Sequence, residues 1–227
     1  MRKTNIEKLK ETLNLFLMLE VEKIDAMPFM VQHPIFEYSV LYDEERNPIS
    51  ILEPEGLEKI RKQTRKKIEQ CESASQCMMI MRKSYYLTFL KFTKEYLSNE
   101  DFSKLLAFAW VSSEAPNNDV NVSQAEILKW FNNAEKEKLM REEDFCTYTE
   151  LPGRITVYRG IGTESRENGI SWTLDKEKAT WFARRFSEGY VIQGTVEKKD
   201  ILAFFNDRKE KEVIISPRNV KEKVKLP

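Results

Sequence analysis

The 227-residue chain has a single histidine, His33, and only seven glycines. One imidazole leaves little room for Ser-His-Asp or Cys-His catalysis. The few glycines form no GxxxxGK[ST] phosphate loop, no GxGxxG dinucleotide fingerprint and no GxSxG nucleophile elbow. These absences exclude kinases and triad hydrolases as function classes.

Cysteine is also scarce. The three thiols, Cys71, Cys77 and Cys146, are an odd number and contain no CxxC pair. With one histidine in the chain, a four-ligand zinc site would need distant carboxylates to complete it. We therefore expect reduced, inert thiols and no structural metal.

Long hydrophobic runs are missing. The longest, at residues 13–19 and 105–111, fall short of the roughly 18–20 residues that cross a bilayer. The first twelve residues are charged and amphipathic, and they lack the apolar middle and the cleavage site of a secretory signal. We expect a cytoplasmic protein with no membrane partner.

The chain has no excess of either charge, with 37 Lys and Arg against 37 Asp and Glu, which excludes a global basic field for nucleic acids. Charge is uneven locally: residues 60–94 hold nine basic and two acidic side chains, and residues 95–150 hold five basic and twelve acidic. We favour two solvated helix faces that pair with each other. The alternative is that the basic stretch, interleaved with Tyr85, Tyr86 and Phe89, contacts phosphates of a nucleic acid.

Hydrophobic residues make up 41% of the chain, enough for a globular protein. Up to residue 150, apolar residues recur at the three- and four-residue spacing of helices, and Ser123 with Glu126 forms a capping box. Residues 36–52 are the exception and could form a β-hairpin. This pattern predicts a mainly helical lobe over 1–150.

After residue 150 the pattern becomes β-rich. Strands are expected at 155–161, 169–174, 190–197, 200–205 and 212–216. One helix interrupts them at 175–186, with Asp175 as its N-cap, and the Leu-Pro-Gly turn at 151–153 marks the boundary. The expected fold class is α+β: the helical lobe followed by a β-rich core over 151–227 with an inserted helix, both packed as one compact unit.

Three segments of this core carry chemical groups in a fixed order: Val157-Tyr158-Arg159-Gly160, then Gly169-Ile170-Ser171-Trp172-Thr173, then Glu210-Lys211-Glu212. Side chains alternate along a strand, so Ser171 and Thr173 share one face, as Glu210 and Glu212 would. An arginine beside a glycine suits a diphosphate, because the guanidinium binds anions bidentately and glycine lets a ligand approach the backbone.

In this order the segments resemble the mono-ADP-ribosyltransferase superfamily, in its arginine–serine–glutamate branch of cholera-toxin-like, clostridial and phage enzymes. The resemblance covers about residues 151–217 and implies an ADP-ribosyltransferase-type core with NAD as co-substrate. It implies that Arg159 holds the phosphate and ribose part of NAD and that Gly160 presents backbone to the nicotinamide amide. Ser171 would orient the catalytic glutamate. Trp172 and Thr173 replace the middle Thr and last Ser of the family's Ser-Thr-Ser motif, so Thr173 keeps a hydroxyl on the NAD-binding face.

The same resemblance implies that Glu212 is the catalytic glutamate, which binds the 2′-hydroxyl of the nicotinamide ribose and stabilises the oxocarbenium-like charge. Glu210 would orient or deprotonate the acceptor. Phe204 and Phe205 fall where the family carries its target-recognition loop, although alternation places one of them in the core.

We therefore expect an NAD-dependent mono-ADP-ribosyltransferase acting on a macromolecule inside the cell. A phage effector or a bacterial toxin of a toxin–antitoxin or antiviral-defence system, with an antitoxin partner, follows by analogy alone. Glu210 with Glu212 slightly favours protein arginine as acceptor, whereas the basic stretch favours a base of RNA or DNA. Two further alternatives are an NAD glycohydrolase, with water as acceptor, and a non-catalytic NAD-binding or protein-interaction module.

Overall fold

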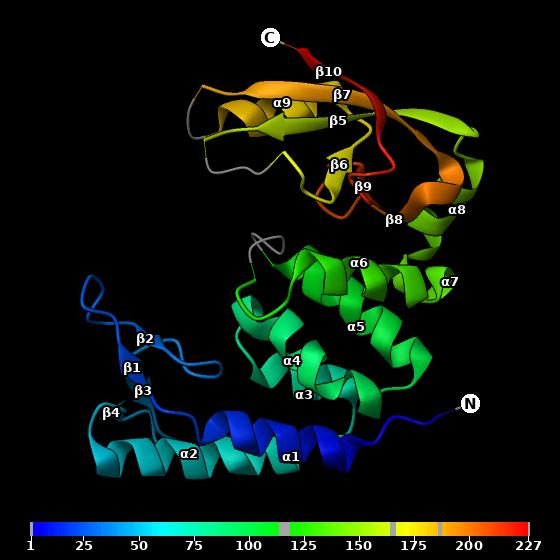
Figure 1. Cartoon of the computed structure of the whole chain (residues 1–227). Helices are drawn as coiled ribbons and strands as arrows, with labels where there is room; N and C mark the ends of the chain where they lie inside the picture. Colours follow the sequence, from blue (N-terminus) through cyan, green and yellow to red (C-terminus); the bar gives the residue numbers. More distant parts are fainter. Residues whose placement is uncertain (1, 114–118, 164–166, 186–187, 227) are drawn as a thin grey trace. The chain divides into compact units, whose positions relative to one another are not determined.

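The computed structural model describes residues 2–113, 119–163, 167–185 and 188–226. The described chain is mixed α+β, as expected, and divides into two compact units. Unit 1 comprises residues 1–105 and 112–119, and unit 2 comprises residues 106–111 and 120–227. Figure 1 shows the elements along the chain.

Unit 1 is mainly helical. Its helices are α1 (Ile6–Leu17), α2 (Pro54–Glu69), α3 (Ala74–Ile80), α4 (Tyr86–Thr93) and the first part of α5 (Asn99–Ser112), with 3₁₀ turns η1 (Lys83–Tyr85) and η2 (Lys94–Tyr96). Its strands pair as β1 (Glu22–Lys23) with β2 (Val31–Gln32) and β3 (Val40–Tyr42) with β4 (Pro48–Ser50). The β3–β4 pair is an antiparallel hairpin within the 36–52 segment.

The core of unit 1 follows from the helical spacing of its apolar residues. Leu9, Leu13 and Leu17 lie four residues apart on one face of α1 and are fully buried where α1 packs against α2 and α3. Asn5 caps α1 by accepting a hydrogen bond from the backbone N–H of Lys8.

Unit 2 contains a six-stranded, wholly antiparallel sheet in the order β10-β7-β5-β6-β9-β8. The strands are β5 (Arg154–Ile161), β6 (Ser171–Thr173), β7 (Tyr190–Glu197), β8 (Ile201–Phe205), β9 (Glu212–Ile215) and β10 (Lys221–Leu226). The helices are α6 (Gln124–Asn133), α7 (Lys136–Leu139), α8 (Glu142–Glu150) and α9 (Lys176–Arg184), with 3₁₀ turn η4 (Lys198–Asp200).

Helices pack on both halves of this sheet. The helix α9 packs on β5 and β7, whereas α6, α7 and α8 pack on β8. The start of α9 is fixed by Asp175, whose carboxylate accepts hydrogen bonds from the backbone N–H groups of Glu177 and Lys178. Ser123 and Glu126 form the expected capping box at the start of α6.

The division between the units differs from the expected boundary at residue 150. The helices α6, α7 and α8 group with the sheet, and so do residues 106–111 of α5. The reason is packing: Trp110, Ile127 and Phe131 are buried in unit 2, with Trp110 and Phe131 in edge-to-face contact. The helical periodicity identified these residues as core without indicating which core they join.

Candidate active site

The three chemical segments lie on three neighbouring strands. Arg159 is on β5, Ser171 begins β6 and Glu212 begins β9, and β6 pairs antiparallel with both of the others. Thr173 stands opposite Tyr158 on β5 and opposite Glu212 on β9. The sheet order therefore brings together residues that are up to 53 positions apart in the sequence.

Glu212 is a buried carboxylate with 8% of its surface exposed. Its Oε1 accepts hydrogen bonds from Ser171 Oγ at 2.5 Å and from Trp110 Nε1 at 3.1 Å. Burial raises the pKa of Glu212, and the hydroxyl and indole donors act in the opposite direction. Both donors reach the same oxygen, and among the described residues Oε2 receives no hydrogen bond. Oε2 is thus the oxygen that can accept a proton or hydrogen bond from a ligand.

Arg159 supplies a cation beside this carboxylate. Its Nη1 donates to the backbone carbonyl of Ser171 at 2.5 Å, so Ser171 binds Arg159 through its carbonyl and Glu212 through its hydroxyl. Burial lowers the pKa of Arg159 to about 10, while the charge of Glu212 acts to raise it. A pKa of about 10 keeps the guanidinium charged at neutral pH.

Close packing explains why two positions in the motifs are glycine. A Cβ on Gly169 would lie 2.0 Å from Arg159 Nη2 and 2.2 Å from Arg159 Cζ, so the guanidinium occupies the space of a side chain there. A Cβ on Gly160 would lie 2.1 Å from the carbonyl oxygen of Ala179 in α9. Gly160 is therefore needed where α9 packs on β5, and its expected backbone contact with nicotinamide stays a prediction.

Thr173 makes two hydrogen bonds within the chain, and its expected contact with NAD stays a prediction. Its hydroxyl donates to the carbonyl of Glu210 at 2.5 Å and accepts from the backbone N–H of Asp175 at 3.0 Å. Thr173 is 5% exposed. These two hydrogen bonds join the start of α9 to the loop before β9. Thr173 therefore holds the backbone of Glu210 in place.

The loop around Glu210 breaks the expected strand alternation of Glu210 and Glu212, because β9 begins only at Glu212. Lys209 and Lys211 have φ values of 55° and 45°, a left-handed conformation that costs a non-glycine residue about 1 kcal/mol or more. Hydrogen bonds from Lys209 N and Lys211 N to Asn206 hold this conformation. The Glu210 side chain is 21% exposed, 3.7 Å from Arg208 Nε.

The expectation for Phe204 and Phe205 was wrong. Both rings are buried, with 2% and 4% of their surface exposed. Phe205 contacts Phe131 of α6, and the backbone N–H of Phe204 points at Met140 Sδ. Because both faces of β8 are covered at this point, neither ring is exposed for an acceptor.

The basic stretch at 60–94 lies in unit 1, where several of its cations bind the chain itself. Arg61 donates to the carbonyls of Leu17 and Leu19, and Arg82 donates to the carbonyl of Val31. Of the interleaved aromatics, Tyr86 and Phe89 are buried in the core. These contacts favour a structural role for much of the stretch.

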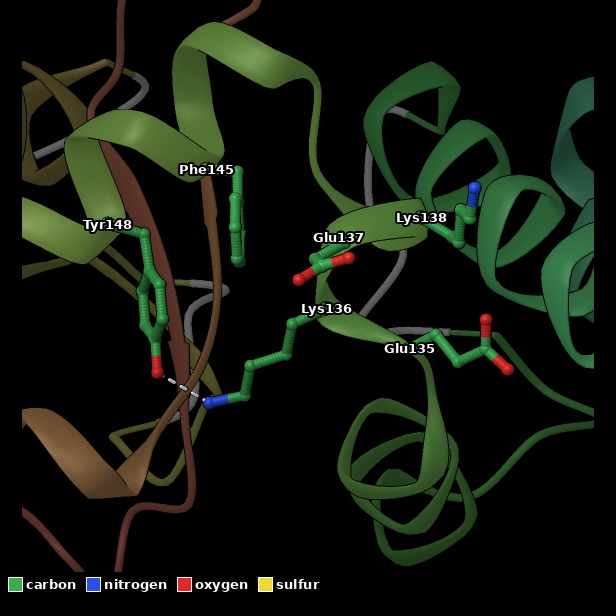
Figure 2. Close-up of a pocket in the computed structure, with 6 residues that line it drawn as sticks. All are labelled: Glu135, Lys136, Glu137, Lys138, Phe145 and Tyr148. Atoms are coloured by element: carbon green, nitrogen blue, oxygen red, sulfur yellow. Dashed lines mark hydrogen bonds between the residues drawn. The ribbon is translucent and has the colours of Figure 1, made fainter.

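A pocket of about 480 Å³ in unit 2 is formed by residues of α7 and α8 and the residue before α7, and no motif residue lines it (Figure 2). It is lined by Glu135, Lys136, Glu137, Lys138, Phe145 and Tyr148. Lys136 Nζ donates to Tyr148 Oη at 2.5 Å and to the carbonyl of Ile201 at 2.9 Å. This lysine ties α7 to α8 and β8, so we assign the pocket a structural origin and place the candidate site at Glu212.

Sequence reasoning missed Trp110, the second donor to Glu212. It lies 102 residues before Glu212 in an apolar helix, where nothing distinguishes it from an ordinary core residue. Within the described ranges, no three His, Cys, Asp or Glu side chains cluster as a metal site would need. No helix in the described parts of the chain is long and apolar enough to cross a membrane.

Comparison with known proteins gives no relative for this chain: no protein-family profile, no curated protein and no solved structure matches it.

Proposed function

We propose that Arg159, Ser171 and Glu212 bind NAD, and that the chain is a mono-ADP-ribosyltransferase with an ADP-ribosyltransferase-type core. The observation that carries this proposal is the geometry of Glu212: a buried carboxylate with one oxygen fixed by two donors, the other available, and a charged arginine beside it. These groups fit NAD by their chemistry, since the guanidinium suits its diphosphate and the available oxygen suits a ribose hydroxyl.

In the proposed reaction the bond between nicotinamide and ribose C1′ breaks, and nicotinamide leaves with the bonding electron pair. Glu212 accepts the hydrogen bond of the ribose 2′-hydroxyl and stabilises positive charge as it develops on the ribose. A nucleophile of the acceptor then forms the new bond to C1′ and gives up its proton. A preorganised charge of this kind contributes about 10²–10³-fold to the rate.

The acceptor we favour is an arginine side chain of a protein. Glu210 supports this choice because it is partly exposed and close enough to Glu212 to raise the pKa of that residue. Its carboxylate is suited to orient a guanidinium and to take the proton released on transfer. The burial of Tyr86 and Phe89 removes part of the support for a nucleic-acid acceptor.

The test is transfer from NAD labelled in its adenosine part to large molecules of a cell lysate. We expect label that protease releases and nuclease does not, with none transferred by Glu212→Gln. Glu197→Gln, at the exposed end of β7, is the matched control and should transfer as wild type does. Label released by nuclease alone would replace the protein acceptor by a nucleic acid. Free ADP-ribose as sole product would indicate a glycohydrolase, and no nicotinamide release together with an unchanged Tm on adding NAD would leave a non-catalytic module.

A further inference from the structure

Trp110 is the only indole that binds Glu212 among the described residues. It is fully buried in unit 2, where its ring meets that of Phe131 edge to face at 5.2 Å between centroids. Its Nε1 lies 3.1 Å from Glu212 Oε1, and Ser171 Oγ lies 2.5 Å from the same oxygen. The aromatic packing fixes the indole, and the indole in turn fixes the carboxylate.

The chemistry of an indole suits this position. Its N–H is a donor only, so it binds the anionic carboxylate better than the protonated acid. It carries no formal charge, so it supports the anion of Glu212 and adds no second charge next to Arg159. A hydrogen bond to a buried charged group stabilises it more than a bond between neutral groups does.

We propose that Trp110 is a positioning residue: with Ser171 it holds Glu212 by Oε1, favours the anionic form and leaves Oε2 for the ribose hydroxyl of the substrate. This inference deepens the proposed transferase function and rests on it. Three charged groups influence Glu212: Arg159 from β5, and Arg208 and Glu210 from the loop before β9. Each is the same in a Trp110 variant, so a change in the titration of Glu212 reports on the indole.

The first test is Trp110→Phe, which keeps an aromatic ring and removes the N–H. We expect kcat for nicotinamide release to fall about tenfold with little change in KM for NAD. The acidic limb of the pH–rate profile should move to higher pH by about one pH unit, because the carboxylate loses a donor that favours its charged form.

Trp130→Phe is the matched control, since Trp130 is also buried in unit 2 and makes no hydrogen bond to Glu212. It should lower Tm as a cavity does while leaving the acidic limb in place. Equal displacement of the limb in both variants, or none in Trp110→Phe, would overturn the proposal.

A second measurement does not depend on catalysis or on the folding of a Trp110 variant. In the folded wild-type protein, the indole N–H resonance of Trp110 should shift with pH as Glu212 titrates. In Glu212→Gln the same resonance should stay constant. A resonance that is constant in both proteins would overturn the positioning role. Titration of the resonance in a protein that releases no nicotinamide would leave the coupling intact and reject the proposed function instead.

Discussion

Gly169 lies against the guanidinium of Arg159, and one added methyl group there should displace that side chain. In Gly169→Ala the new Cβ would lie 2.0–2.7 Å from three guanidinium atoms, far inside ordinary van der Waals contact. The guanidinium cannot stay where it is, and moving it by an ångström or more breaks its hydrogen bond to the Ser171 carbonyl.

The expected loss of stability follows from the displacement of the Arg159 guanidinium. A hydrogen bond from a charged donor contributes about 1.5–3 kcal/mol, and overpacking a buried site costs about 1–3 kcal/mol. Since the guanidinium either moves or strains its surroundings, we expect a loss of about 2–3 kcal/mol in the free energy of unfolding. For a chain of this size that corresponds to a fall of roughly 4–12 °C in Tm. NAD affinity should fall as well, because Arg159 no longer lies beside Glu212.

The assay is thermal unfolding by calorimetry, followed by calorimetric titration with NAD. Gly153→Ala is the matched control, because nothing lies within 4 Å of a Cβ at Gly153. That variant should keep the wild-type NAD affinity and lose no stability. If Gly169→Ala unfolds within about 1 °C of Gly153→Ala and of wild type, the packing of Arg159 against Gly169 is refuted.

Three further predictions concern stability. Glu212→Gln should raise the free energy of unfolding, measured in urea near pH 8, by about 1 kcal/mol. The substitution removes a buried charge, and the amide oxygen of the new side chain still accepts a hydrogen bond from Ser171. A less stable variant would contradict the inference that burial disfavours the charge of Glu212. Burial is the main reason that the pKa of His33 is lowered from 6.5 to about 4. Between pH 6.5 and pH 4 the unfolded chain therefore binds one proton more than the folded chain. The free energy of unfolding should fall by about 3 kcal/mol as the pH drops from 6.5 to 4. His33→Asn, which keeps an acceptor for the backbone N–H groups of residues 35 and 36, should flatten that pH dependence; an unchanged slope assigns it to other groups. Lys209→Gly should raise Tm by relieving a left-handed φ, whereas Lys209→Val should lower it, and the reverse order would show that the loop is not left-handed at this residue.

The sequence predicts much of the sheet because its strands are short apolar runs between turns. The expected strand at 190–197 is β7 itself, and Asp175 caps α9 as expected. The strand β10 was not expected, since Lys221, Lys223 and Lys225 alternate along it and charge gives no apolar signal. Charged side chains of this kind are typical of an edge strand, and β10 lies at the edge of the sheet.

Local patterns fail where distant parts of the chain meet. Strand alternation predicted one exposed ring at Phe204 and Phe205, but both faces of β8 are covered, so both rings are buried. Alternation likewise placed Glu210 and Glu212 on one face, and two left-handed residues in the loop break it. The hydrogen bond of Trp110 to Glu212 joins residues 102 positions apart, a distance at which sequence spacing carries no information.

In the proposed reaction, the buried carboxylate of Glu212, beside Arg159, promotes cleavage of the nicotinamide–ribose bond of NAD. The most direct measurement is nicotinamide release by the purified protein, compared between wild type and a folded Glu212→Gln variant with unchanged circular dichroism. We expect release by wild type and a rate lower by about 10²-fold or more in the variant. Equal rates in the two proteins, or no release by wild type with any acceptor fraction of a lysate, would contradict the proposed reaction.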